Sequence, residues 1–130
     1  MFMSILSING NSSMNFLLQT ILAKRYKLIT VSDVFHGMYQ LKHHSDIDLI
    51  IIDMDYQAQE NKDFICHIKT SRLYSRPVIA LSSNKSNGID GLFAETKVYT
   101  HFIKPFNPLE LERCISELMK PSPVQSINKN

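Results

Sequence analysis

The sequence predicts an α/β fold built on a parallel sheet, and three observations support this prediction. Short apolar stretches of strand character alternate five times with stretches in which apolar residues recur at helical spacing. One strand stretch, Ile47–Ile52, is an almost unbroken aliphatic run, which is typical of a central parallel strand covered on both faces. The chain has 130 residues, which fits one domain and is enough to bury a core.

The first half of the sequence contains three strand–helix pairs. The strands are expected at Ser4–Ile8, Lys27–Val31 and Ile47–Ile52. The first helix has one apolar face, formed by Met14, Leu17, Leu18, Ile21 and Leu22. Ser12 or Ser13 is placed to cap this helix, because a serine hydroxyl accepts a hydrogen bond from a backbone N–H of the first turn.

The second and third helices follow the same pattern of one apolar face each. Asp33 is expected to cap the second helix. The apolar residues of that helix are Val34, Phe35, Met38 and Leu41. A third helix is expected around Asp63–Thr70. Its apolar face is formed by Phe64, Ile65 and Ile68.

The second half contains two further pairs. The fourth strand is expected at Pro77–Leu81, with its proline at the permitted first position, and the fifth at Tyr99–Ile103. Between them, the range Asn84–Thr96 contains two glycines and few apolar residues, so its helix is expected to be short or loose. The last helix begins at Asn107-Pro108-Leu109-Glu110, which combines an N-cap with a proline at the first helical position. Its buried face is Leu111, Cys114, Ile115 and Leu118.

Five strand–helix units joined by right-handed crossovers predict a doubly wound, flavodoxin-like sheet of strand order 2-1-3-4-5 with five helices. This domain is expected to span residues 1–120. The segment 121–130 is polar and has no periodicity, so we expect a disordered tail or the start of a linker.

Composition narrows the possible function classes. No apolar run approaches the roughly 20 residues that cross a bilayer. The apolar start Met1–Ile8 is short and lacks a basic leader, so we expect a first strand, a cytoplasmic protein and no membrane attachment. A net charge of +2 with scattered basic residues argues against nucleic-acid binding. Cys66 and Cys114 have no metal or redox spacing and are expected to be reduced packing residues.

Polar and charged residues follow the predicted strands at their carboxyl ends. Asp53 and Asp55 follow the third strand, Ser82 the fourth, Lys104 the fifth, and the range 9–11 the first. Parallel strands bring these ends to the same edge of the sheet. A carboxylate needs positive charge beside it to attack phosphorus, so an aspartate and a lysine at this edge favour a phosphoryl-accepting pocket. An aspartate that merely ends a strand is the alternative interpretation of Asp53.

The stretches 47–55 and 101–106 resemble the receiver domain of two-component response regulators, and the resemblance covers about Ser4–Met119. It implies that Asp53 is the phospho-acceptor, while Ser82 and Lys104 contact the phosphoryl group. It also implies that the peptide bond before Pro105 is cis. His101 stands where the family usually has a Tyr or Phe that swings inward, so it is the candidate switch residue. A half-exposed histidine on an edge strand is the alternative.

The resemblance also implies a Mg²⁺ site, from which this sequence departs. In the family, an acidic pair after the first strand holds the ion together with the phospho-acceptor and the carbonyl two residues later. That pair falls on Asn9 and Gly10, which carry no charge. The candidate metal ligands that remain are Asp53, Asp55 and Asn9. With two carboxylates missing, we expect Mg²⁺ to bind weakly or not at all, and Lys104 to pair directly with Asp53.

These observations lead to one main functional hypothesis and two others. The main one is an atypical receiver domain, itself not an enzyme, that accepts a phosphoryl group on Asp53 from a sensor histidine kinase. The expected partners include a second copy, bound through the fourth helix, fifth strand and fifth helix, and an output domain after residue 120. The alternative is a phosphorylation-independent interaction module with the same fold. The third is a small-anion or flavin binder that uses the loop 9–13 before the first helix.

Overall fold

The computed structural model describes residues 3–44, 46–83, 98 and 100–120. Its five parallel strands form one sheet in the order β2-β1-β3-β4-β5, which confirms the predicted topology. The strands are β1 Ser4–Ile8, β2 Lys27–Val31, β3 Ile47–Asp53, β4 Val78–Ser82 and β5 Thr100–Ile103. The helices within the described residues are α1 Ser12–Leu22, α2 Val34–His43, α3 Ala58–Thr70 and α5 Pro108–Leu118. The helix expected at Asn84–Thr96 and the tail 121–130 lie outside the described residues.

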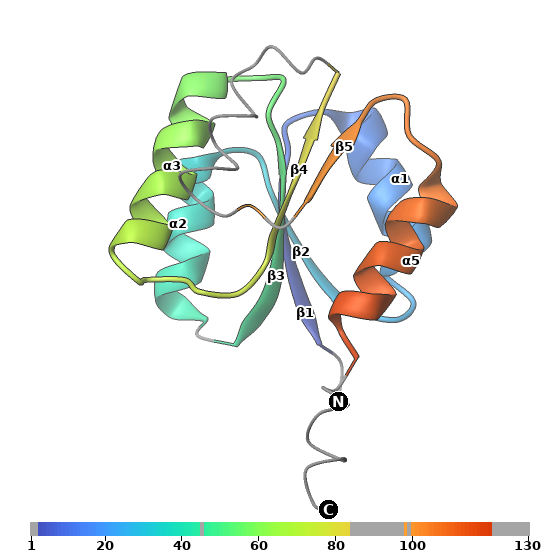
Figure 1. Ribbon diagram of the computed structural model, residues 1–130, viewed down its shortest axis with the longest axis horizontal. Coiled ribbons are helices and arrows are strands. Elements are labelled where there is room, and N and C mark those ends of the chain that lie inside the picture. Colours follow the sequence, from blue (N-terminus) through green and yellow to red (C-terminus); the bar gives the residue numbers. More distant parts are fainter. Residues whose placement is uncertain (1–2, 45, 84–97, 99, 121–130) are drawn as a thin grey trace, which may run out of the picture.

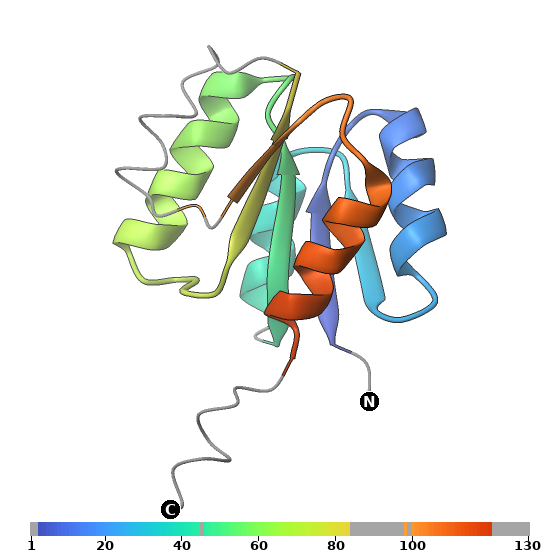
Figure 2. The ribbon, with the colours of Figure 1, turned by 45° about the vertical axis from the view of Figure 1, so that its right-hand side comes forward.

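The helices cover the two faces of the sheet in pairs. Figures 1 and 2 show α2 and α3 on one face and α1 and α5 on the other. The core divides in the same way, because Phe64 and Ile68 of α3 pack in one buried cluster. Leu18 of α1 and Leu111 of α5 pack in the other. The molecule is therefore a three-layer sandwich whose central layer is the sheet.

The aliphatic strand β3 lies at the centre of this sandwich. Ile50 and Ile52 belong to the core under α2 and α3. Leu49 and Ile51 belong to the core under α1 and α5. All four side chains are at most 1% exposed, and successive residues point to opposite faces as strand geometry requires. The carboxyl end of β3, where the site residues begin, is therefore held rigidly on both sides.

Two of the three predicted helix caps are confirmed and one is wrong. Asp33 Oδ1 accepts the His36 N–H at 3.0 Å, and Asn107 Oδ1 accepts the Leu109 N–H at 2.9 Å. At α1, however, Asn11 is the cap, since its Oδ1 accepts the Met14 N–H at 2.9 Å. The two serines predicted to cap α1 are instead its first two residues. Asparagine caps as well as serine does, so a run of short polar residues does not show which one ends the turn.

The third helix begins five residues earlier than expected, at Ala58. Its first turn is polar and carries no apolar periodicity, which is why the sequence pattern indicated only the second half. The chain enters it through Gln57, which adopts a left-handed conformation with φ 57° and makes no side-chain cap. Asn61 in the first turn secures this entry by hydrogen bonds to the last residue of β3 and to the loop that follows it.

Several smaller expectations have clear outcomes. Strand β4 runs from Val78 to Ser82, so Pro77 lies just before it. Phe35, expected among the apolar residues of the second helix, is 72% exposed. Cys66 and Cys114 are half-buried, as expected of packing residues. Across the part of the chain that the structure describes, each helix is too short or too polar to cross a bilayer.

Candidate functional site

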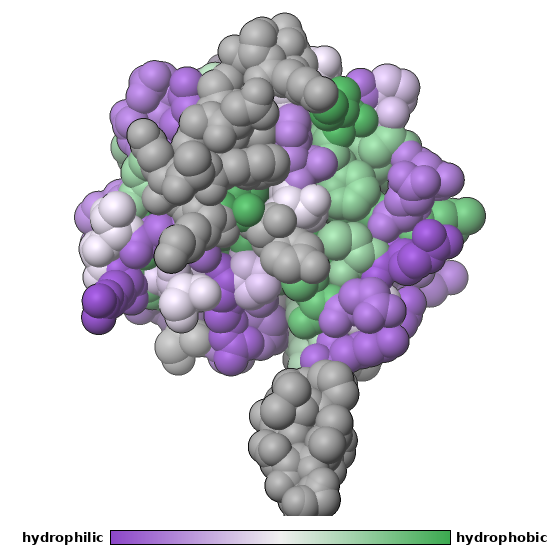
Figure 3. Space-filling view, in the orientation of Figure 1, coloured by the Kyte–Doolittle hydropathy of each residue, from purple (hydrophilic) through white to green (hydrophobic). Residues whose placement is uncertain are grey.

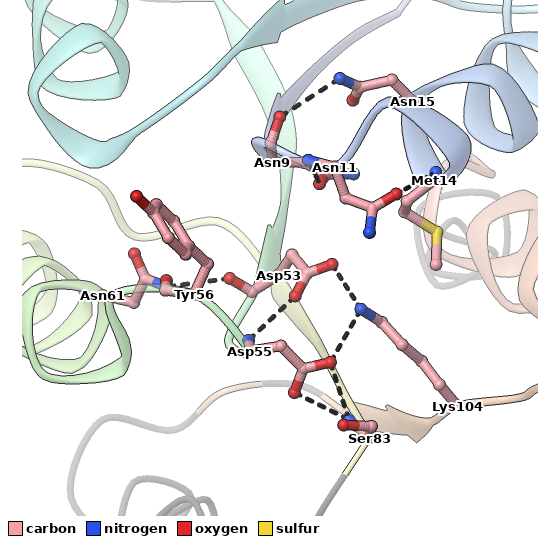
Figure 4. Close-up of polar contacts among 10 residues, drawn as sticks. All are labelled: Asn9, Asn11, Met14, Asn15, Asp53, Asp55, Tyr56, Asn61, Ser83 and Lys104. Atoms are coloured by element: carbon pink, nitrogen blue, oxygen red, sulfur yellow. Dashed lines mark hydrogen bonds and ion pairs between the residues drawn. The ribbon is translucent and has the colours of Figure 1, made fainter.

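Three neighbouring strands end together and place the predicted site residues at one edge of the sheet. Asp53 and Ser82 are the last residues of β3 and β4, and Lys104 directly follows β5. The sheet pairing continues past β5, because the Lys104 N–H donates to the Ser82 carbonyl at 2.9 Å. The Lys104–Pro105 peptide bond is cis, as the resemblance implies. The side chains of Asp53 and Lys104 lie on the same edge of the sheet and face each other (Figure 4).

Lys104 binds two carboxylates at once. Its Nζ lies 2.6 Å from Asp53 Oδ2 and 2.9 Å from Asp55 Oδ2. The three side chains are 18%, 6% and 27% exposed for Lys104, Asp53 and Asp55. The expected direct pair of Asp53 and Lys104 is thus present and largely shielded from water, which strengthens its electrostatic attraction.

Asp55 is more than a loop carboxylate, because it connects the ends of three strands. Its two carboxylate oxygens accept the Ser83 backbone N–H at 2.9 and 3.1 Å, and one of them also binds Lys104. Its own N–H donates to Asp53 Oδ1 at 2.9 Å. Asp55 therefore holds β3, β4 and β5 in register at the site. From the sequence, Asp55 is either a candidate metal ligand or a loop carboxylate, and neither interpretation anticipates its contact with Ser83.

Ser82 and His101, the other predicted site residues on β4 and β5, lie near the Lys104 cluster, but the contacts of Lys104 do not define their roles. The Ser82 side chain is fully buried at the end of β4. His101 lies in β5 in register with Ala80 and is half-buried. Both interpretations of His101, the switch residue and the edge-strand histidine, are compatible with this position.

The charges of the cluster shift the pKa of both ends of the Lys104–Asp55 pair. Burial opposes the charged form of Lys104, but the hydrogen bonds and the attraction of the two carboxylates outweigh it and raise the pKa of Lys104. Burial likewise opposes the charged form of Asp55, yet the hydrogen bonds from Ser83 and the attraction of Lys104 outweigh it and lower its pKa. Both shifts favour the charged forms, so the ion pair persists at neutral pH.

These shifts predict how stability depends on pH. A carboxyl group whose pKa is lowered on folding stabilises the protein at pH values above its ordinary pKa of 3.8. This contribution is lost as the pH falls through the lowered pKa of the folded state. The difference in the free energy of unfolding between the wild type and Asp55→Asn should therefore be largest near neutral pH and shrink on acidification. Urea unfolding at several pH values measures it. Glu117→Gln is the control, since its 64% exposed side chain should change stability by less than about 0.5 kcal/mol throughout. A constant Asp55→Asn difference would contradict the assignment.

Asn61 is a site residue that sequence reasoning missed. It is 3% exposed, and its Nδ2 donates to the Asp53 carbonyl at 2.8 Å and to the Tyr56 carbonyl at 2.9 Å. A signal was present in the sequence, because Asn61 lies three and four residues before Phe64 and Ile65 and shares their buried face. A polar residue at such a position is expected to have a specific hydrogen-bond partner.

The loop after β1 faces the carboxylates across a small cavity. Asn9 is 3% exposed and lines a cavity of about 90 Å³ together with Asp53, Asp55, Asn61 and Lys104. Its Oδ1 accepts the Asn11 N–H at 2.7 Å. Its Nδ2 is buried and has no hydrogen-bond partner within the described part of the chain.

The residues present do not fit Mg²⁺, which prefers six oxygen ligands in an octahedron. Three carboxylates line the cavity, and all have partners: Asp53 and Asp55 bind Lys104, while Asp33 accepts from the Ser32 hydroxyl and the His36 N–H. The Asn9 oxygen also already accepts a backbone N–H. Within the described ranges, no three His, Cys, Asp or Glu side chains gather into a group that could hold a metal ion. The anion-binding hypothesis is also weakened, because the Met14 N–H at the start of α1 already donates to Asn11 and is not available to an anion.

Solved structures with the same fold are response regulator receiver domains. The signal receiver domain of an HD domain-containing protein from Pseudomonas fluorescens Pf-5 matches with a TM-score of 0.80 and 18% identity over 91% of this chain and 87% of that chain. The chemotaxis protein CheY4 of Vibrio cholerae matches with a TM-score of 0.80 and 17% identity over 92% of this chain and 100% of that chain. The receiver domain of the sensor histidine kinase PA1611 from Pseudomonas aeruginosa PAO1, with a magnesium ion coordinated in its active site cleft, matches with a TM-score of 0.77 and 19% identity over 91% and 98%.

These structural matches are not accompanied by matches in sequence. Neither a scan against protein-family models nor a search of the curated proteins finds a match. With identities of 17 to 19%, the comparisons show that this chain has the receiver-domain fold.

Proposed function

We propose that this chain, which has the receiver-domain fold, is an atypical receiver in two-component signal transduction and accepts a phosphoryl group on Asp53 from a histidine kinase. The observation that supports this most strongly is the 2.6 Å pair of Asp53 and Lys104 at the carboxyl edge of the sheet. A nucleophilic carboxylate and a cation brought from two separate strands meet the main requirement of phosphoryl transfer, which is positioning next to positive charge.

The chemistry assigned to the chain is a single transfer. A carboxylate oxygen of Asp53 attacks the phosphorus of a phosphohistidine, and the oxygen–phosphorus bond forms as the phosphorus–nitrogen bond breaks. The imidazole leaves with the electron pair of that bond and takes up a proton from water. Lys104 stabilises the negative charge on the transferred group, and Ser82 is assigned to bind one of its oxygens. The chain accepts this group without turning over a substrate, so we do not assign it an enzymatic activity.

The partners follow from the same proposal. A sensor histidine kinase supplies the phosphoryl group to this chain, for which we propose a cytoplasmic location, and the change is passed on through β5, α5 and the range 84–96. Hydrophobic residues gather on the surface over β5 and beside α5 (Figure 3). Ile103 at the end of β5 is 39% exposed, and Leu109 in the first turn of α5 is 64% exposed. Exposed apolar residues at such a surface favour protein contacts. We assign to it a second copy of the chain or an output domain that follows residue 120.

A second candidate function is supported by the same ion pair. Lys104 already neutralises the charge of both carboxylates in part, and the site does not fit a magnesium ion such as the one coordinated in the active site cleft of the PA1611 receiver domain. A site whose charges are satisfied without phosphate is suited to a phosphorylation-independent interaction module. In that case the fold serves as a scaffold for its surfaces.

Phosphoramidate distinguishes the two functions, because it carries the phosphorus–nitrogen bond of a phosphohistidine without a partner protein. Intact-mass spectrometry after incubation should show one phosphoryl adduct on the wild type. Asp53→Asn should show none, while the control Glu117→Gln, at a 64% exposed side chain, should retain the adduct. Incubations with MgCl₂ and with EDTA are run in parallel. A folded wild type that gains no adduct in either would exclude Asp53 as an acceptor and favour the interaction module.

A further inference from the structure

We infer that the candidate site holds its carboxylates without a divalent metal ion and that the Lys104 ammonium is its resident cation. This inference goes beyond the proposed function, because it concerns the unphosphorylated chain and would hold for either candidate. It rests on the position of Lys104, on the use of the site oxygens and on the residues that follow β1.

The ammonium group occupies the place between the two carboxylates. Lys104 Nζ contacts one oxygen of Asp53 at 2.6 Å and one of Asp55 at 2.9 Å, and Figure 4 shows it facing both. An ion that bridged these two oxygens would need the same place. Lys104 is tethered to β5, so its effective concentration at the site is high and a free ion must compete with it.

Several other oxygens of Asp53 and Asp55 also accept hydrogen bonds. Asp53 Oδ1 accepts the Asp55 N–H at 2.9 Å, and the Asp53 carbonyl accepts from Asn61 at 2.8 Å. Both oxygens of Asp55 accept the Ser83 N–H. Magnesium needs about six oxygens at roughly 2.0–2.1 Å in a strict octahedron and gives up its water reluctantly. Binding here would require it to displace Lys104 and disturb these hydrogen bonds.

Asn9 has one side-chain oxygen that could bind a metal ion, and this oxygen already accepts a hydrogen bond. Its amide oxygen is turned to the Asn11 N–H at 2.7 Å, which defines the orientation of the amide. The remaining polar atom, Nδ2, is buried and has no partner within the described residues. The only side-chain oxygen of Asn9 is thus already used by a backbone N–H, so Asn9 offers little to a cation.

Gly10 shows that the backbone does not prevent metal binding. A Cβ built on Gly10 would meet the Ser32 carbonyl oxygen at 3.4 Å, an ordinary contact, and its backbone is not in the left-handed region. A side chain is therefore sterically allowed at this position. The absence of carboxylates at residues 9 and 10, more than the shape of the loop, accounts for the poor fit to Mg²⁺. Two substitutions should then be enough to create a metal site.

Titration with magnesium chloride alone, followed by calorimetry and by thermal unfolding, tests the inference. The wild type should show no saturable heat and no shift of Tm up to about 10 mM MgCl₂. Asn9→Asp combined with Gly10→Asp should bind at least about tenfold more tightly than the wild type. Gly10→Ala, which adds a Cβ without a charge, is the matched control and should behave as the wild type.

A second variant tests the role of Lys104 independently of the new carboxylates. Lys104→Met leaves Asp53 and Asp55 without their cation, so its Tm should rise with MgCl₂ although that of the wild type does not. Saturable Mg²⁺ binding by the wild type, abolished in Asp53→Asn, would overturn the inference. A Lys104→Met variant that is folded and insensitive to Mg²⁺ would count against Lys104 as the resident cation. A phosphoramidate adduct that forms only with MgCl₂ would uphold the proposed function and overturn this inference.

Discussion

Replacing Lys104 by methionine is expected to lower the free energy of unfolding by about 2–3 kcal/mol. Methionine keeps most of the apolar stem but removes the charge that faces Asp53 at 2.6 Å and Asp55 at 2.9 Å. Asp53 is only 6% exposed, so its carboxylate then lacks both a cation and water. The expected loss is smaller than for a fully buried pair because Asp55 is 27% exposed. Urea unfolding at neutral pH measures it.

The matched variants separate the charge from the packing of the lysine stem. Asp53→Asn alone should cost less than about 1 kcal/mol, because Lys104 keeps Asp55 as its partner. In the Lys104→Met background, Asp53→Asn should restore part of the lost stability, since it removes the unpaired charge. If the effects of the two substitutions simply add, the two residues do not interact and the proposed cluster is wrong.

Replacing Asn61 by alanine is expected to lower the free energy of unfolding by about 2–3 kcal/mol. Its Nδ2 is a donor to two carbonyls, those of Asp53 and Tyr56, at the point where the chain passes from β3 into α3. Alanine leaves both oxygens without this donor beside a side chain that is 3% exposed. The effect should appear in chemical unfolding and as faster amide exchange in the first turn of α3.

Two controls make the Asn61 prediction specific. Asn61→Asp preserves the shape but offers only acceptor oxygens when ionised, so at neutral pH it should cost at least as much as alanine. Gln59→Ala, on the exposed side of the same helix, should change stability by less than about 0.5 kcal/mol. An Asn61→Asp variant as stable as the wild type would show that the two hydrogen bonds contribute nothing.

The sheet and the main site pair could be predicted because each depends on a local pattern. The aliphatic run of β3 indicates a central strand. The polar residues that end or follow parallel strands lie at the carboxyl edge of the sheet, independently of the conformation of the loops. Asp53 and Lys104 could therefore be paired across 51 residues of sequence, and the structure places them 2.6 Å apart. Strand order follows from the handedness of the crossovers rather than from any side-chain detail.

The features that escaped prediction depend on hydrogen bonds between a side chain and a backbone group elsewhere in the chain. No periodicity reveals that Asp55 accepts from the Ser83 N–H, because the contact joins a side chain to a backbone atom 28 residues away. The early start of α3 rests on Asn61 in the same way. The prediction for Phe35 is wrong for a different reason. Successive residues of a helix point about 100° apart, so Phe35, which follows the buried Val34, lies on the solvent side of α2.

The most direct test of the account is to locate the phosphoryl group on the chain. Borohydride reduces an acyl phosphate to the alcohol, so reduction after phosphoramidate treatment converts a phosphorylated aspartate to homoserine, which peptide mapping by mass spectrometry identifies. The account predicts homoserine at residue 53 and none at residue 55, although Asp55 shares the same lysine. Homoserine at residue 55, or no conversion in a folded protein, would contradict the assignment of Asp53 as the acceptor.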